Sequence, residues 1–186
     1  MANLPMRYII DQVDRLVEDC GSRDPFEICE SLGIQVFEDD LKQAIKGYFF
    51  CYQDTRVCVY DSNLIKVFRP ILVAHELGHA VLHQELALLH SFQEMDVLDN
   101  STAQPEEYEA NLFAAELLLT DEAVIEALNG ESFFEAARQL NVPAALLDFK
   151  FSLMQRKGYQ IRRQYIAGSD FMKQELGAYD SNDYIC

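Results

Sequence analysis

The spacing of apolar positions predicts two helices at the start of the chain. Between Pro5 and Gly21 apolar residues recur every three or four positions, as on an amphipathic helix with proline at its start and glycine past its end. Residues 24–27 (DPFE) have the order of a capping box with proline at the first helical position, so a short second helix follows and ends at Gly33.

Aromatic and β-branched residues mark the expected strands. Residues 34–37 predict a first strand, and residues 47–52 and 57–60 predict a hairpin across a polar turn. Cys51 and Cys58 would then face each other, and small core side chains are the favoured interpretation over a redox pair. The expected sheet is therefore small and partly antiparallel.

The second half of the chain has helical patterning. The apolar segment after Pro70 continues to Leu82 without another proline, which predicts a buried helix beside the sheet. Polar residues and helix breakers over 91–105 predict a mobile loop. Helices are then expected over residues 106–119, 121–128, 132–140 and 143–157. The fold class is therefore α+β and mostly helical.

Length and patterning together give the expected domain organisation. A chain of 186 residues with 49% hydrophobic content can bury a full core. We expect residues 1–120 to form that core and residues 121–160 to form a helical extension of the same domain. Residues 161–186 are too weakly patterned to assign and are treated as a tail.

The net charge excludes some partners. A formal charge of −16 argues against direct binding to nucleic acid or to an anionic membrane, because phosphate recognition needs a positive surface. A neutral or basic protein partner fits better. One basic island interrupts the acidic chain, and the solvated face of a helix is its favoured interpretation. It consists of Lys150, Arg156, Lys157, Arg162 and Arg163.

Cysteine usage and the N-terminal residues suggest a cytoplasmic protein. The five cysteines form no CxxC pair and leave an odd member, so reduced thiols are expected rather than a disulfide framework. The first residues lack a basic region followed by an apolar one, and no apolar run reaches the length of a membrane span.

The most informative motif is His-Glu-x-x-His. On a helix His75 and His79 lie one turn apart on the same face, so both imidazoles can bind one metal ion while Glu76 flanks it as a base. This is a signature of zinc hydrolases. Gly78 inside the helix predicts the close approach of another element.

A catalytic zinc site needs a third protein ligand from elsewhere in the chain. His83 continues the four-residue spacing, but it lies about 12 Å along the helix from His75, too far to share a metal. We interpret His83 as a helix-packing residue or a support for a liganding histidine. His90 is interpreted as a surface or loop residue.

The segment after the polar loop is the better source of the third ligand. Its inward stripe is expected to be Ala110, Phe113, Ala114, Leu117 and Leu118.

Glu107 lies on the edge of that stripe, with Asn111 one turn later to accept a hydrogen bond from the ring N–H of a liganding histidine. Glu106 lies near the stripe but has no polar residue four positions on. Glu109 and Glu116 are interpreted as solvated acidic side chains.

Two sequence blocks in this order resemble the ImmA/IrrE family of zinc metallopeptidases. They are AHELGH at residues 74–79, followed by LH at 82–83, and EYEANLFAAELL at 107–118. The resemblance covers about residues 24–120 and implies a zincin-like domain. It implies one zinc ion per chain on His75, His79 and Glu107, with Glu76 as the base. The chain departs from the family at Thr120, where a proline is usual, and in its divergent C-terminal part.

The resemblance also implies a substrate class. Members of this family cleave or inactivate helix-turn-helix (XRE-type) repressors, so we expect a zinc endopeptidase that relieves repression of genes. One alternative is a zinc-containing binding module that antagonises a transcriptional regulator by sequestration without cleavage. Another is a helical interaction protein in which the motif arose by chance. Metal content separates the last hypothesis from the other two.

Overall fold

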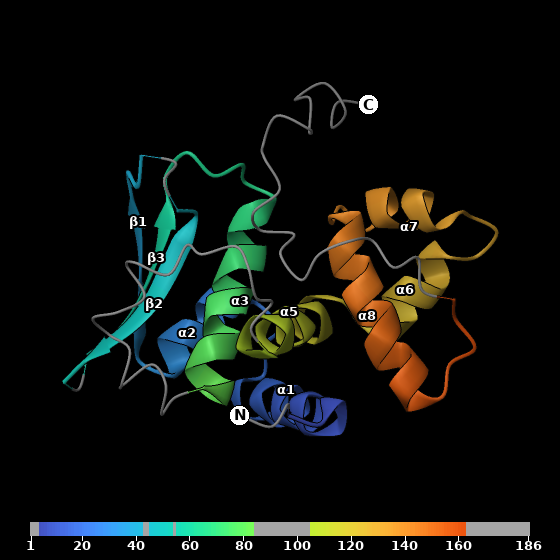
Figure 1. Ribbon diagram of the computed structural model, residues 1–186, viewed down its shortest axis with the longest axis horizontal. Helices are drawn as coiled ribbons and strands as arrows, with labels where there is room; N and C mark the ends of the chain where they lie inside the picture. The colour runs from blue at the N-terminus through green and yellow to red at the C-terminus, as the bar shows by residue number, and fades with distance from the viewer. Residues whose placement is uncertain (1–3, 43–44, 54, 84–104, 163–186) are drawn as a thin grey trace.

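The computed structural model describes residues 4–42, 45–53, 55–83 and 105–162, and it has the α+β, mostly helical fold expected from the sequence. A small sheet lies on one side of α3, and α5 lies between α3 and α8 (Figure 1). The helices are α1 (Met6–Cys20), α2 (Pro25–Ser31), α3 (Phe68–Leu82), α5 (Pro105–Leu118), α6 (Asp121–Ala127), α7 (Phe133–Gln139) and α8 (Ala144–Lys157). The strands are β1 (Ile34–Asp39), β2 (Gly47–Tyr52) and β3 (Thr55–Asp61).

The first two helices begin and end at the expected signals. Helix α1 ends at Gly21, whose φ of 67° is the left-handed conformation that glycine adopts at helix ends. The Asp24 side chain accepts a hydrogen bond from the Phe26 N–H at the start of α2. In a capping box the glutamate side chain also bonds back to the N-cap backbone N–H. Here Ser22 mediates that contact, because its hydroxyl accepts a hydrogen bond from the Asp24 N–H and donates one to Glu27. These contacts fix the start of α2 locally.

The sheet is mixed, as expected, with strand order β1-β3-β2. Strand β3 pairs parallel with β1 and antiparallel with β2. The expected cross-strand pair of cysteines is wrong: Cys51 pairs with Arg56, and Cys58 pairs with Phe49. The hairpin closes tightly at the pair Tyr52–Thr55, so the two thiols lie diagonally rather than opposite each other. Among the described cysteines all four are free.

Helices α3 and α5 approach closely at Gly78. A Cβ atom built on Gly78 would lie 3.1 Å from Ala110 Cα and 3.2 Å from Phe113 Cβ. The close approach expected from the glycine is therefore confirmed, and its partner is the helix that carries Glu107. The packing places the motif helix directly against the second sequence block.

Helix α5 is buried on all sides rather than along one stripe. It packs against α3, α1 and α8, and every residue from Glu109 to Leu117 is buried. The expectation that Glu109 and Glu116 are solvated is therefore wrong. The sequence did contain a signal: between residues 110 and 118 only Asn111 and Glu116 are polar, which is typical of a helix with no solvated face.

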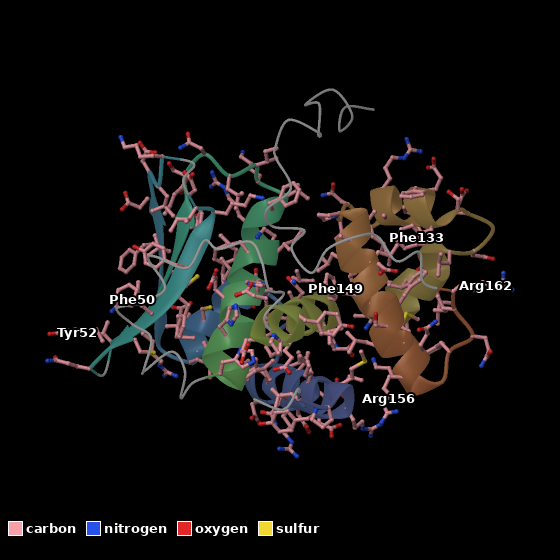
Figure 2. The ribbon with its side chains drawn as sticks, viewed as in Figure 1. Phe50, Tyr52, Phe133, Phe149, Arg156 and Arg162 are labelled. Atoms are coloured by element: carbon pink, nitrogen blue, oxygen red, sulfur yellow. The ribbon has the colours of Figure 1, made fainter. Side chains whose placement is uncertain are left out.

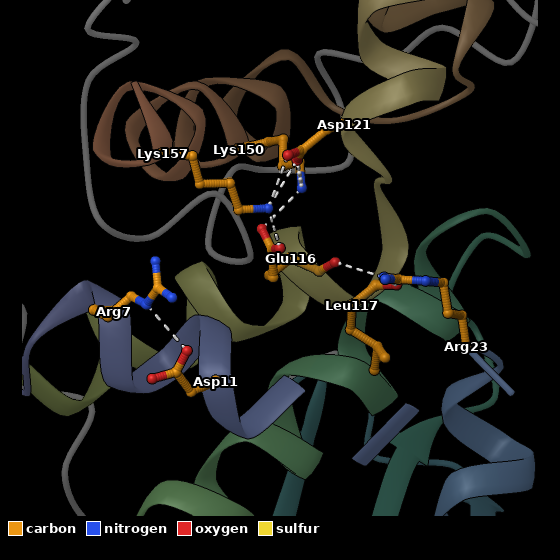
Figure 3. Close-up of polar contacts among 8 residues, drawn as sticks. All are labelled: Arg7, Asp11, Arg23, Glu116, Leu117, Asp121, Lys150 and Lys157. Atoms are coloured by element: carbon orange, nitrogen blue, oxygen red, sulfur yellow. Dashed lines mark hydrogen bonds and ion pairs between the residues drawn. The ribbon is translucent and has the colours of Figure 1, made fainter. Parts of the chain in front are cut away.

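Glu116 belongs to a buried ion cluster that joins α5 to the C-terminal helices (Figure 3). Lys150 Nζ lies 2.8 Å from Glu116 Oε2 and 2.7 Å from an Asp121 oxygen, and Lys157 contacts the same two carboxylates. Two ammonium groups and two carboxylates thereby neutralise each other. The Arg23 guanidinium also donates to the backbone carbonyls of Glu116 and Leu117 near the end of α5.

The basic island is therefore not one solvated face. Lys150 is 1% exposed, which contradicts the expectation, whereas Arg156 and Arg162 are exposed (Figure 2). The physical reason is that Lys150 faces α5 and finds carboxylate partners there. Arg163, His90 and Cys186 lie outside the described residues, as do residues 91–104 of the expected loop and residues 163–186 of the expected tail. None of the described helices is long and apolar enough to cross a membrane.

Candidate metal centre

Three of the side chains singled out from the sequence meet between α3 and α5. His75 Nε2 and His79 Nε2 lie 3.1 Å apart. The Glu107 carboxylate lies 3.3 Å from His75 Nε2 through Oε2 and 3.4 Å from His79 Nε2 through Oε1. In the part of the chain that the structure describes, this is the group of histidine, cysteine and acidic side chains close enough to share a metal ion.

The spacing of the two ring nitrogens fits a tetrahedral metal. Ligand atoms about 2.0–2.1 Å from a tetrahedral zinc ion lie about 3.3–3.4 Å from each other. The two ring nitrogens are 3.1 Å apart, close to that edge length, and they face different oxygens of Glu107 at 3.3 and 3.4 Å. Three protein donors also leave the fourth corner of the tetrahedron for water or substrate, as in catalytic sites.

Asn111 fixes the tautomer of His75. Its Oδ1 lies 2.9 Å from His75 Nδ1, and the Asn111 side chain is buried. An amide oxygen accepts a hydrogen bond, so His75 Nδ1 carries the proton and Nε2 presents a lone pair. The contact expected between Asn111 and a candidate liganding histidine is present.

His79 has a different supporting contact. Its Nδ1 lies 3.2 Å from His83 Nδ1, and His83 Nε2 lies 2.9 Å from Glu109 Oε2. His83 is thus packed along α3 in contact with a candidate ligand, as the sequence suggested. Glu109, which the sequence analysis placed in solvent, is its buried acidic partner.

The pKa shifts of Glu107 and His79 suit a cation, whereas that of His75 favours its protonated form in the metal-free site. Burial raises the pKa of Glu107, but its hydrogen bonds to His75 and His79 outweigh burial and hold the pKa well below the usual range. Burial lowers the pKa of His79, which favours the neutral ring. Burial also acts to lower the pKa of His75, but the hydrogen bond to Glu107 and the charge of Glu76 raise it overall. The site therefore combines an ionised carboxylate with imidazole nitrogens.

Glu76 follows His75 on α3. It is 8% exposed, and its charge raises the pKa of His75. Burial, together with the charge of Glu76, also raises the pKa of the Cys58 thiol on β3. The carboxylate is thus close to both the candidate ligands and the sheet, where a base could act on a bound water molecule.

The residues of the candidate metal centre all fall in one recognised domain. A family model described as the IrrE N-terminal-like domain, of the M78 peptidases, matches residues 29–152. The chain belongs to the ImmA/IrrE family of metallopeptidases.

Two relatives support this membership along most of the chain. Metallopeptidase ImmA of Bacillus subtilis (strain 168) is 32% identical over 144 residues, which cover 76% of this chain and 82% of the relative. Immunity region protein 2 of Bacillus phage phi105, described as uncharacterized, is 32% identical over 147 residues, or 78% of this chain and 90% of the relative. Membership in a metallopeptidase family implies that a metal ion is the cofactor.

Proposed function

We propose that this protein is a zinc-dependent endopeptidase with one zinc ion per chain, held by His75, His79 and Glu107. The observation that carries the proposal is the short distance between two ring nitrogens, His75 Nε2 and His79 Nε2, at 3.1 Å. If the Nδ1 atoms carry the ring protons, as their contacts favour, two lone pairs and a carboxylate face one point. A cation at that point relieves their repulsion.

The donor set favours zinc among the common metals. Imidazole nitrogens with a single carboxylate suit zinc, whereas magnesium and calcium prefer oxygen ligands throughout. Two histidines and one glutamate with an open fourth position form a recurring catalytic zinc arrangement.

The chain's own groups perform the proton transfers in this proposal. Zinc, when bound, polarises the peptide carbonyl and lowers the pKa of water to about 7. Glu76 accepts a proton from the attacking water and donates it to the leaving amine.

The substrate we propose is a helix-turn-helix transcriptional repressor whose cleavage relieves repression of its genes. One relative is called a metallopeptidase and the other an immunity region protein, which supports a link between peptidase activity and gene regulation. The net charge of −16 complements the basic DNA-binding face of such a repressor and disfavours DNA itself.

A cleavage assay tests this proposal. The repressor encoded beside this gene is incubated with the wild-type protein or with Glu76→Gln, and new chain termini are identified by mass spectrometry. Glutamine keeps the shape of the side chain and removes its basicity, so cleavage should fall by about 10²–10⁴-fold with zinc still bound. Glu126→Gln, an exposed carboxylate on α6, is the matched control and should cut normally.

Two results would speak against cleavage as the function. Release of the repressor from DNA by wild type and Glu76→Gln alike, with no new termini, would establish a zinc-containing module that acts by sequestration. Equal cleavage by both proteins would remove Glu76 from the chemistry.

A further inference from the structure

A line of polar contacts continues from the candidate metal centre into the protein core. His79 Nδ1 lies 3.2 Å from His83 Nδ1, and His83 Nε2 lies 2.9 Å from Glu109 Oε2. The side chains of His83 and Glu109 are 7% and 6% exposed. The other Glu109 oxygen accepts a hydrogen bond from the Leu4 backbone N–H at 2.6 Å.

The acceptor at the end of this line sets the direction of every hydrogen bond in it. A carboxylate accepts hydrogen bonds, so His83 Nε2 must donate to Glu109. When His83 is neutral it has one N–H, which leaves its Nδ1 as an acceptor. His79 Nδ1 must then carry a proton and donate it to His83, so His79 Nε2 is left with the lone pair that a metal requires.

The reversed arrangement is unfavourable at one particular contact. If His83 carried its proton on Nδ1, its Nε2 lone pair would face the buried Glu109 carboxylate at 2.9 Å. Two acceptors at that distance repel each other, and burial gives neither of them water as an alternative partner. Glu109 therefore decides the tautomer of His83 and, through it, the tautomer of His79.

We propose that His83 and Glu109 are positioning residues that hold His79 in its metal-binding tautomer, with the Leu4 backbone N–H orienting the Glu109 carboxylate. This inference rests on the metal centre proposed above. It gives the two candidate histidine ligands separate supports: His75 donates to Asn111, and His79 donates to the His83–Glu109 pair. It also links residue 4, just before α1, to the metal centre through one carboxylate.

Zinc affinity measured by chelator competition tests the proposal without relying on activity. Glu109→Gln keeps the size of the side chain but replaces one acceptor oxygen by an amide donor, and His83→Phe keeps a ring and removes both nitrogens. Each variant should bind zinc about 10–100-fold more weakly than wild type.

The matched control is Glu116→Gln, which makes the same change on the same helix at a buried carboxylate that faces lysines. It should lower the stability of the protein while leaving the zinc affinity of the folded molecules within about twofold of wild type. Wild-type zinc affinity in both Glu109→Gln and His83→Phe would overturn the proposal.

A second measurement stands even if those variants fail to fold. Long-range ¹H–¹⁵N correlation spectra of the zinc-loaded wild-type protein report which ring nitrogen carries the proton. We expect Nδ1–H on His79 and Nε2–H on His83, and the opposite tautomers would overturn the proposal. A protein that binds no zinc would instead contradict the proposed function, so the two failures are distinguishable.

Discussion

Lys150 Nζ lies 2.8 Å from Glu116 Oε2, and neither side chain is more than 2% exposed. The pair joins α8 to α5, the helix that also carries Glu107. Asp121 and Lys157 complete the cluster, so the C-terminal helices are held to the metal-bearing core by charges as well as by apolar packing. A buried charge that loses its partner is costly, which makes this cluster sensitive to single substitutions.

Lys150→Met should lower the free energy of unfolding by about 2–4 kcal/mol, because Glu116 and Asp121 are left to share one ammonium group instead of two. Urea denaturation measures the change. Arg156→Met, on the same helix but exposed, should stay within about 0.5 kcal/mol of wild type. Equal losses of unfolding free energy in the two variants would show that the buried pair stabilises the protein no more than an exposed side chain does.

The same cluster predicts how stability changes with acid. Burial raises the pKa of Asp121, but hydrogen bonds to Lys150 and Lys157 outweigh burial and place the pKa below its ordinary value of 3.8. A depressed folded-state pKa stabilises the protein above pH 3.8, and that contribution is lost as the pH falls through the folded-state pKa. Asp121→Asn should therefore flatten the acid side of a plot of unfolding free energy against pH. An unchanged acid slope in this variant would contradict the assignment.

Lys157 acts in the opposite direction on the alkaline side. Burial lowers its pKa, but the hydrogen bonds to Glu116 and Asp121 raise it overall above 10.5. Its contribution is complete below pH 10.5 and is lost as the pH rises through the folded-state pKa. Asp121 and Lys157 therefore both contribute fully to stability between pH 3.8 and pH 10.5, a range that includes neutral pH.

Gly78→Ala should destabilise the protein, although alanine is the better helix former. The new Cβ would meet the α5 backbone 3.1 Å away, and overpacking of this kind costs about 1–3 kcal/mol against a helix-propensity gain of about 1 kcal/mol. Thermal unfolding of the metal-free protein gives the stability, and chelator competition gives the zinc affinity. Both should fall, because a shift of α5 away from α3 moves Glu107 away from the histidines. A raised melting temperature would show that the contact between α3 and α5 can accommodate the added methyl group.

The candidate site was largely predictable because it depends on local helix geometry. The four-residue spacing of His75 and His79 places them on one helix face. The same spacing from Glu107 to Asn111 singled out Glu107 as a candidate ligand on the second helix. The boundaries of α1 followed from Pro5 and Gly21 for the same local reason. Periodicity within one element needs no knowledge of the rest of the fold.

The features that were missed depend on contacts distant in sequence. The partner of Glu109 is His83, which is 26 residues away in the sequence. The partner of Glu116 is Lys150, which is 34 residues away. A charged side chain is normally solvated, so its burial becomes predictable only when its partner is known. The predicted pairing of Cys51 with Cys58 was wrong for a related reason, because the register of the two strands depends on the geometry of the turn that joins them. The proposed extension over residues 121–160 stays a prediction.

Zinc K-edge X-ray absorption of the zinc-loaded protein tests the central claim most directly. One zinc per chain should show four nitrogen or oxygen neighbours at about 2.0–2.2 Å, with an imidazole signature from two histidines. His75→Ala and His79→Ala should each lose the ion. A sulfur neighbour at about 2.3 Å, or stoichiometric zinc retained in both alanine variants, would contradict a zinc centre built from His75, His79 and Glu107.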